Sequence, residues 1–178
     1  MSLIPQDRSK LSPMMQQYLS MKDEHRDQIL MFRLGDFYEM FFDDAVTASR
    51  ELELTLTGRD CGLPDRAPMC GVPYHSVENY IARLVKKGYK VAICEQMENP
   101  ALAKGMVKRD IVRVVTPGTL MEANMLEEGS NNYICSLCPA GERCGLAFAD
   151  ISTGSVLVTE VSGEMAAINE LGKYAPHE

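Results

Sequence analysis

The sequence predicts an α/β fold, in which a mixed β-sheet flanked by helices is followed by a partial, mainly antiparallel β-meander with a helix. Between residues 10 and 120, apolar runs of strand length alternate with stretches whose apolar residues recur at helical spacing. Between residues 131 and 178, three short apolar runs are separated by turn-forming residues, and a helical stretch follows. We therefore expect one complete domain at 10–120, a linker at 121–130 and the truncated start of a second domain at 131–178.

The first domain is expected to open with a helix, a strand and a second helix. Ser12-Pro13 is a helix-start signal, and an apolar side continues from it to about residue 25. The apolar run 29–32 suits a buried strand, which Gly35 ends. Asp36 is expected to cap the second helix. The apolar stripe of that helix consists of Phe37, Phe41, Ala45, Ala48 and Leu52.

The later elements are predicted from turn residues and apolar runs. A strand at 55–57 leads into a polar loop at 58–68, and a helix capped by Ser76 ends at Gly88. Two strands and a Thr-Pro-Gly-Thr turn complete the first domain, at 89–95, 111–115 and 116–119. The second domain is expected to contain strands at 133–137, 145–149 and 155–161, and a helix that starts near Glu164.

Composition indicates a globular chain, with 46% hydrophobic and 24% charged residues. It has neither an apolar run of membrane-spanning length nor an apolar signal-peptide core, so we expect a cytoplasmic protein whose six cysteines are free thiols. The net charge of −7 arises entirely beyond Leu120, where 2 basic residues stand against 9 acidic ones. Charge alone therefore argues against a nucleic-acid ligand.

The run Asp36-Phe37-Tyr38-Glu39 has two interpretations. Asp at a cap with Glu three positions later resembles a capping box, with Phe37 opening the core stripe, and local spacing alone favours this structural role. Alternatively, Phe37 is an exposed aromatic wedge and Glu39 faces the same ligand. Since a carboxylate gains nothing from a phosphate backbone, such a ligand would have to offer a base edge.

Seven collinear segments together resemble one known protein family, and the match covers almost everything from Leu11 onward. The segments that carry the resemblance are Phe32-Arg33-Leu34-Gly35-Asp36-Phe37-Tyr38-Glu39-Met40-Phe41, Leu56-Thr57-Gly58-Arg59, Pro68-Met69-Cys70-Gly71-Val72-Pro73-Tyr74-His75, Val77-Glu78-Asn79-Tyr80, Val91-Ala92-Ile93-Cys94-Glu95-Gln96, Val114-Val115-Thr116-Pro117-Gly118-Thr119 and Gly145-Leu146-Ala147-Phe148-Ala149-Asp150-Ile151-Ser152-Thr153-Gly154. The first six resemble the mismatch-recognition domain of the MutS family of DNA mismatch repair proteins, and the last resembles the opening of that family's connector domain.

The resemblance implies a module that recognises mismatched or unpaired bases in double-stranded DNA. Phe37 would stack on the mispaired base from the minor groove and Glu39 would hydrogen-bond it. Arg59, Met69 and Arg109 are further candidate DNA contacts, although a solvated loop arginine, a core methionine and a solvated strand end are their ordinary roles. If specificity rests on how easily a duplex deforms, a strongly cationic surface would dilute it, so the charge objection weakens.

The resemblance also implies what this chain lacks and what a whole family member binds. It implies no catalytic residue, metal or cofactor in this chain, whereas the parent protein would be an ATP-dependent homodimeric clamp that uses ATP and Mg²⁺ downstream. The connector would contact a repair partner of the MutL type, and no membrane would be involved. No Gly-x4-Gly-Lys-[Ser/Thr] string occurs in the sequence.

Three other hypotheses stay open. A domain that only binds other proteins would draw on the acidic second segment. A metal-dependent nuclease-like domain would use carboxylates such as Asp36, Glu39, Glu95 and Asp110 to hold Mg²⁺. The spacing of Cys135, Cys138 and Cys144 hints at zinc, but no fourth ligand is suitably spaced, and buried strand thiols are the favoured interpretation.

Overall fold

The computed structural model describes residues 2–98, 103, 105–121, 125–126 and 129–178. The described part of the chain divides into two compact units, Met1–Val115 and Thr116–Glu178. Half of the expected linker, residues 122–124, 127 and 128, lies outside the described residues.

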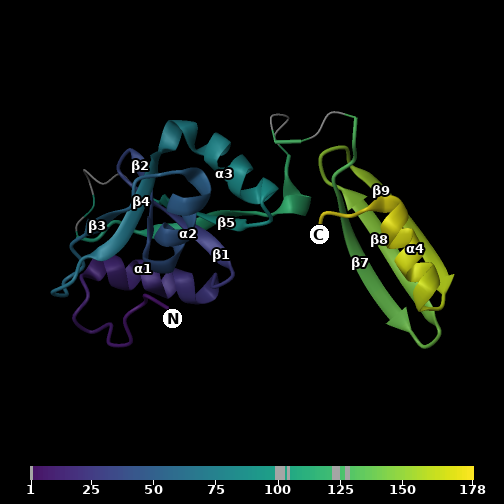
Figure 1. The fold of residues 1–178 in the computed structure, drawn as a ribbon, viewed down its shortest axis with the longest axis horizontal. Coiled ribbons are helices and arrows are strands. Elements are labelled where there is room, and N and C mark those ends of the chain that lie inside the picture. The colour runs from purple at the N-terminus through teal and green to yellow at the C-terminus, as the bar shows by residue number, and fades with distance from the viewer. Residues whose placement is uncertain (1, 99–102, 104, 122–124, 127–128) are drawn as a thin grey trace. The chain divides into compact units, whose positions relative to one another are not determined.

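The first unit is built on a six-stranded mixed sheet with helices on both faces (Figure 1). In chain order its elements are α1 (Pro13–Glu24), β1 (Gln28–Leu34), β2 (Phe37–Phe41), α2 (Phe42–Leu52), β3 (Thr57–Arg59), β4 (Ala67–Pro73), α3 (Val77–Lys86), β5 (Lys90–Gln96) and β6 (Arg109–Val115). The strand order is β3-β4-β2-β1-β5-β6, with β1 and β5 parallel and every other pair antiparallel.

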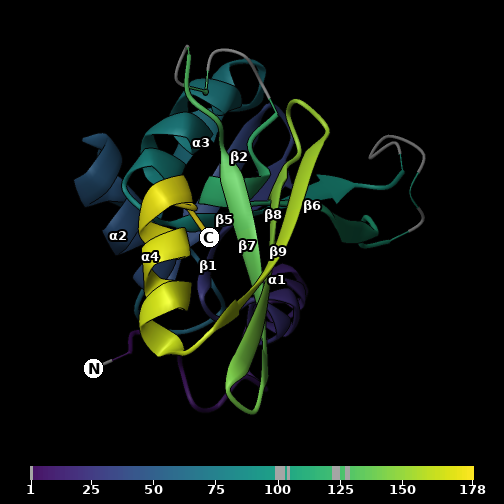
Figure 2. The ribbon, with the colours of Figure 1, turned by 90° about the vertical axis from the view of Figure 1, so that its right-hand side faces the viewer.

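The core of this unit lies on both faces of the central strands. Phe32 on β1 and Cys94 on β5 pack against Tyr18 and Met15 of α1. The alternate residues of the same strands point to the opposite face. There α2 packs on β4, where the Cys70 thiol donates to the carbonyl of Ala45. Figures 1 and 2 accordingly show α1 on one side of this sheet and α2 and α3 on the other.

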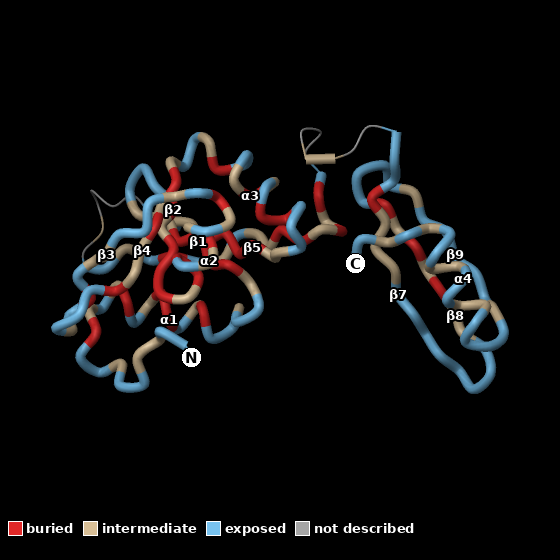
Figure 3. Tube along the Cα trace, in the orientation of Figure 1, coloured by how far each residue is buried: buried red, intermediate tan, exposed pale blue. Residues whose placement is uncertain are grey.

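The second unit is a three-stranded antiparallel meander with one helix. After a short 3₁₀ turn at Pro117–Thr119, its elements are β7 (Tyr133–Ala140), β8 (Arg143–Asp150), β9 (Ser155–Ser162) and α4 (Glu164–Tyr174). Phe148 on β8 packs against Tyr174 of α4, with ring centroids 4.4 Å apart. Figure 3 shows that burial in this unit is concentrated along β8, which carries the buried side chains of Leu146 and Phe148. The predicted fold class is confirmed in both units.

Two expected elements are misplaced, and one strand was not predicted. The helix expected from Asp36 begins only at Phe42, because Phe37–Phe41 is a strand. The strand expected at 55–57 lies at Thr57–Arg59, and β4 was not predicted at all. Ser12 and Ser76 stand at the N-cap positions of α1 and α3 as expected, but neither hydroxyl bonds a backbone amide of its helix, and that of Ser76 donates to the carbonyl of Pro73.

Candidate nucleic-acid interface

Phe37 is the first residue of a strand that follows a tight hairpin turn. Leu34 at the end of β1 pairs directly with Phe37, so Gly35 and Asp36 form a two-residue turn. Gly35 has φ +59°, a conformation that glycine adopts without a steric penalty and that two-residue hairpins require at their first turn position. The turn places the Phe37 ring at the surface, where the residue is 47% exposed.

Strand alternation puts Phe37 and Glu39 on the same face of the sheet. Successive side chains in a strand point to opposite faces, so residues two apart share one face. The intervening Tyr38 points the other way and is buried. Asp36 therefore caps no helix and Glu39 does not fold back onto it; instead, the Tyr74 amide donates to the carbonyl of Asp36 at 2.9 Å. The capping-box interpretation is wrong.

Glu39 is paired with Arg59, and a glycine leaves room beside it. Gly71 on β4 lies directly opposite Glu39, and a Cβ added there would stand 3.4 Å from Glu39 Cγ. Arg59 Nη1 on β3 lies 2.5 Å from Glu39 Oε2, with side chains 38% and 14% exposed respectively. The two predicted contacts thus neutralise each other in this structure.

Met69 lies on the same face, closer to the core. It pairs with Phe41 on one side and with Thr57 on the other, and it is partly buried against the hydrophobic cluster beneath α1. Thr57 Oγ1 donates to the Met69 carbonyl at 3.0 Å. The structure therefore brings Phe37, Glu39, Arg59 and Met69 to one face across β2, β4 and β3.

Arg109 lies inside the first unit. The residue is only 8% exposed, so a solvated strand end is wrong. Its Nε donates to the Arg33 carbonyl at 3.0 Å, and its Nη1 donates to Gln17 Oε1 at 3.0 Å and to the Val107 carbonyl at 3.2 Å. Burial lowers the pKa of Arg109 from its usual value. Because this guanidinium is occupied inside the unit, its burial argues against a phosphate contact.

The carboxylates of the nuclease alternative do not converge. Glu39 pairs with Phe32, which in turn pairs with Cys94, so Glu95 lies one position further along and points to the opposite face. Within the described ranges, no group of three His, Cys, Asp or Glu side chains is placed to hold a metal ion. The geometry therefore does not favour the alternative.

The three cysteines whose spacing suggested a zinc site lie on different faces of their sheet. Cys135 and Cys144 face one side of the three-stranded sheet and Cys138 the other, because Cys138 pairs with Gly145 and not with Cys144. All six cysteines are free thiols. Burial raises the pKa of the Cys70 and Cys94 thiols to about 12, so these two are neutral core side chains.

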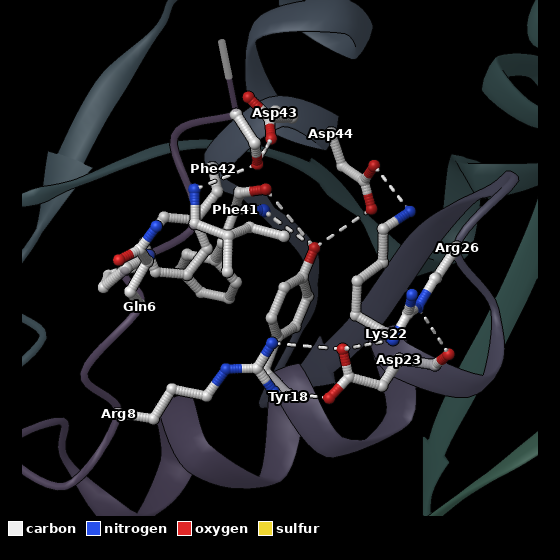
Figure 4. Close-up of a pocket in the computed structure, with 13 residues that line it drawn as sticks. Gln6, Arg8, Tyr18, Lys22, Asp23, Arg26, Phe41, Phe42, Asp43 and Asp44 are labelled. Carbon is white, nitrogen blue, oxygen red and sulfur yellow. Dashed lines mark hydrogen bonds and ion pairs between the residues drawn. The ribbon is translucent and has the colours of Figure 1, made fainter.

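A cavity of about 930 Å³ opens between α1, the start of α2 and residues 2–8 (Figure 4). Its charges are paired with one another: Lys22 Nζ lies 2.9 Å from Asp44 Oδ1, and Arg8 forms an ion pair with Asp23. Burial raises the pKa of Asp44, and Lys22 opposes this rise. Tyr18 Oη lies 3.2 Å from Asp44 Oδ2, which also accepts from the Leu30 amide at 3.0 Å. These polar groups satisfy one another, which marks a structural cluster.

Sequence reasoning missed the residues that support the hairpin from behind. Arg33 Nε donates to the Gly35 carbonyl at 2.5 Å, and its guanidinium carbon stands 3.9 Å from the centroid of the Tyr74 ring. Its Nη1 lies 3.4 Å from Glu95 Oε1, which also accepts from the Tyr38 hydroxyl. No local spacing links these residues, because Arg33, Tyr74 and Glu95 come together only through strand pairing.

Two protein-family models match the chain, MutS domain I over residues 12–124 and MutS domain II over residues 132–178. The chain is 60% identical over 172 residues to the DNA mismatch repair protein MutS of Alkaliphilus oremlandii, a match that covers 95% of this chain and 20% of the relative. It is 61% identical over 173 residues to that of Ruminiclostridium cellulolyticum, covering 94% and 20%. It is also 61% identical over 170 residues to that of Clostridium tetani, covering 95% and 19%. The chain thus spans about a fifth of the length of these relatives. Among the described residues, no helix is long and apolar enough to cross a membrane.

Proposed function

Because the chain belongs to the MutS family and matches its domains I and II, we propose that its first unit recognises mismatched or unpaired bases in double-stranded DNA. Phe37 is the wedge and Glu39 is the base contact. We further propose the domain limits 10–120 and 131–178 predicted from the sequence. The single observation that carries the proposal is an exposed phenylalanine at a hairpin, with a carboxylate two residues further along the same face.

The wedge mechanism follows from the energetics of base stacking. Inserting an apolar ring into a base step costs a few kcal/mol of unstacking and kinks the duplex. A mispaired base has already lost part of its pairing, so it costs least to displace. Stacking on an aromatic ring returns about 1–3 kcal/mol whichever base is involved. Phe37 therefore discriminates through the deformability of the duplex, which suits a sensor for many different mismatches.

Glu39 and Arg59 exchange partners on binding in this proposal. Their ion pair keeps the carboxylate neutralised while the protein approaches the DNA. At a mismatch, Glu39 turns to the exposed edge of the displaced base, and the freed Arg59 reaches a backbone phosphate. Met69 lies beside them as an apolar contact to the minor groove. A matched duplex offers no base edge of this kind, so there the carboxylate stays with Arg59.

The remaining proposals concern the protein that carries this chain. We propose that it is a cytoplasmic, homodimeric clamp whose ATP and Mg²⁺ site lies outside these 178 residues. Its second unit is the start of a connector that contacts a partner of the MutL type. The isolated chain is expected to bind DNA weakly and with little mismatch preference, because other domains of such a clamp enclose the duplex.

The decisive experiment is Phe37→Ala in the full-length protein that carries this chain, with affinities measured on two duplexes that differ at one base pair. Losing the stack is expected to reduce the preference for the mismatch about fivefold to hundredfold. The matched control is Val112→Ala on β6, an exposed apolar residue at 52% exposure, which should leave the preference unchanged.

An unchanged preference in Phe37→Ala would overturn the wedge assignment. Cleavage of either duplex by the 178-residue chain in the presence of Mg²⁺ would instead restore the nuclease alternative. Both duplexes should be tested at several salt concentrations, because phosphate contacts weaken with salt whereas the mismatch preference should persist.

A further inference from the structure

Arg33 lies behind the hairpin that carries Phe37, on the other face of the sheet. It is paired directly with Tyr38, so the two side chains share the face opposite Phe37 and Glu39. The Arg33 side chain is 16% exposed. Arg33 is therefore not placed to reach DNA bound on the Phe37 face.

The hairpin turn is held through both of its residues. The carbonyl of Gly35 accepts a hydrogen bond from Arg33 Nε at 2.5 Å. The carbonyl of Asp36 accepts one from the Tyr74 amide at 2.9 Å. The Arg33 guanidinium then lies on the Tyr74 ring, 3.9 Å from its centroid, which closes a ring of contacts around the turn.

A second set of contacts fixes the Arg33 guanidinium from the side. Arg33 Nη1 lies 3.4 Å from Glu95 Oε1, and the Tyr38 hydroxyl donates to the same oxygen. The Tyr38 ring also lies under the guanidinium carbon, at 5.4 Å. The Arg33 guanidinium therefore lies close to two aromatic rings while its nitrogens bond the Gly35 carbonyl and Glu95. Only a planar, multiply donating group makes these contacts together.

We propose that Arg33, acting with Tyr74, is a positioning residue that holds the Phe37 hairpin rigid for insertion into DNA, an inference that rests on the proposed function above. A base stack resists the insertion of an aromatic ring, and the turn that carries the ring has to bear this load. A turn that yields would lose stacking energy, whereas a preorganised one spends none on ordering itself during binding. Arg33 supplies that rigidity without touching the ligand.

The test compares variants in the full-length protein that carries this chain. Arg33→Lys keeps the positive charge but cannot bond Gly35, bond Glu95 and cover the Tyr74 ring at once. It is expected to lower the mismatch preference about threefold to tenfold. Tyr74→Ala should act in the same direction, whereas Tyr74→Phe keeps the ring and should match wild type. Arg50→Lys is the matched control, since Arg50 is an ion-paired arginine of α2 away from the turn.

Combining Arg33→Lys with Phe37→Ala separates positioning from general stability. If Arg33 acts through Phe37, adding Arg33→Lys to the Phe37→Ala variant causes no further loss of mismatch preference. A drop in affinity for both duplexes that persists in the Phe37→Ala background would overturn the proposal, because it would show a merely structural role.

Two further outcomes distinguish the proposals from each other. If Phe37→Ala lowers the mismatch preference and Arg33→Lys does not, the positioning role is refuted while the wedge stands. If Phe37→Ala has no effect, the proposed function fails first. Hydrogen exchange of the Tyr74 amide gives a direct readout of the turn: it should quicken in Arg33→Lys, and an unchanged rate would overturn the inference.

Discussion

Replacing Lys22 by methionine removes the positive partner of a buried carboxylate at the point where β2 passes into α2. Lys22 Nζ lies 2.9 Å from Asp44 Oδ1, and both side chains are only 10% exposed. Asp44 Oδ2 also accepts from the Leu30 amide, which belongs to central strand β1. The nearby Phe42 has φ +53°, a left-handed conformation that costs a non-glycine residue about 1–2 kcal/mol. Asp44 and its partners stabilise this strained junction.

The structure sets the size of the expected effect. Methionine preserves the length of the side chain, so packing is largely kept, but Asp44 is left as a buried charge with two neutral donors. Breaking a buried ion pair by removing one partner costs about 3–5 kcal/mol. That is a large part of the roughly 5–15 kcal/mol by which a domain is stable. The matched control is Lys87→Met: Lys87 lies 3.0 Å from Glu51, but its side chain is 48% exposed. The control should lose less than about 1 kcal/mol.

The effect of Lys22→Met should depend on pH. Burial raises the pKa of Asp44 and Lys22 opposes the rise, so removing Lys22 raises that pKa further. A carboxyl whose pKa is higher in the folded state binds more protons there, so its contribution to stability falls as pH rises. The loss of stability should therefore shrink on going from pH 8 toward pH 5.

Urea unfolding followed by circular dichroism measures this loss, since the chain contains no tryptophan for a fluorescence assay. Hydrogen exchange of the Leu30 amide reports the same junction locally and separates it from unfolding of the second unit. Equal losses in Lys22→Met and Lys87→Met, or a loss independent of pH, would refute the reasoning.

Four further predictions follow from single contacts. Glu39→Gln keeps a hydrogen-bonding group but removes the charge paired with Arg59, so binding to matched duplex should tighten severalfold and the mismatch preference should fall in duplex-binding titrations. Gly71→Ala places a Cβ 3.2 Å from the Tyr38 carbonyl oxygen and 3.4 Å from Glu39 Cγ, and should reduce the preference with a loss of about 1 kcal/mol in urea unfolding. Arg109→Met should lose about 1–3 kcal/mol of stability, yet leave the salt dependence of DNA binding unchanged; a slope reduced by about one would restore the phosphate contact. The Ser152 hydroxyl is the main cause that lowers the pKa of Asp150 to about 2, so the Asp150 carboxylate stabilises the second unit above about pH 4. This contribution vanishes as the pH falls toward 2. In Asp150→Asn, the free energy of unfolding should therefore depend less on pH between about 4 and 2.

The sequence predicted elements best where one pattern was unambiguous. The helix expected after Ser76 lies at Val77–Lys86, and the three strands of the second unit lie where turn residues bounded them. The failure at 37–41 has a specific cause: Phe37 and Phe41 are four apart, which fits a helical stripe, but four is also an even number and fits one face of a strand. The aromatic residues of this run favoured the strand.

Strand β4 and the burial of Arg109 both depend on residues that are distant in the sequence. Proline and glycine usually argue against a strand, yet β4 contains Pro68, Gly71 and Pro73 and is held between β3 and β2. Arg109 is buried by Arg33 and Gln17, which lie 76 and 92 positions away in the chain. No local pattern encodes contacts of this range, so the candidate residues were found by family resemblance and their surroundings only by the structure.

The spacing of Phe37 and Glu39 along β2 decides whether their side chains share one face of the sheet. Phe37 and Glu39 share a face because a single residue, Tyr38, stands between them and is locked on the other side. Inserting one residue between Phe37 and Glu39 would place their side chains on opposite faces of the sheet and turn the carboxylate toward the interior. Inserting two residues between Phe37 and Glu39 would keep both side chains on one face and change only the distance between them. The spacing between Phe37 and Glu39 can therefore be lengthened in steps of two residues, but not by one.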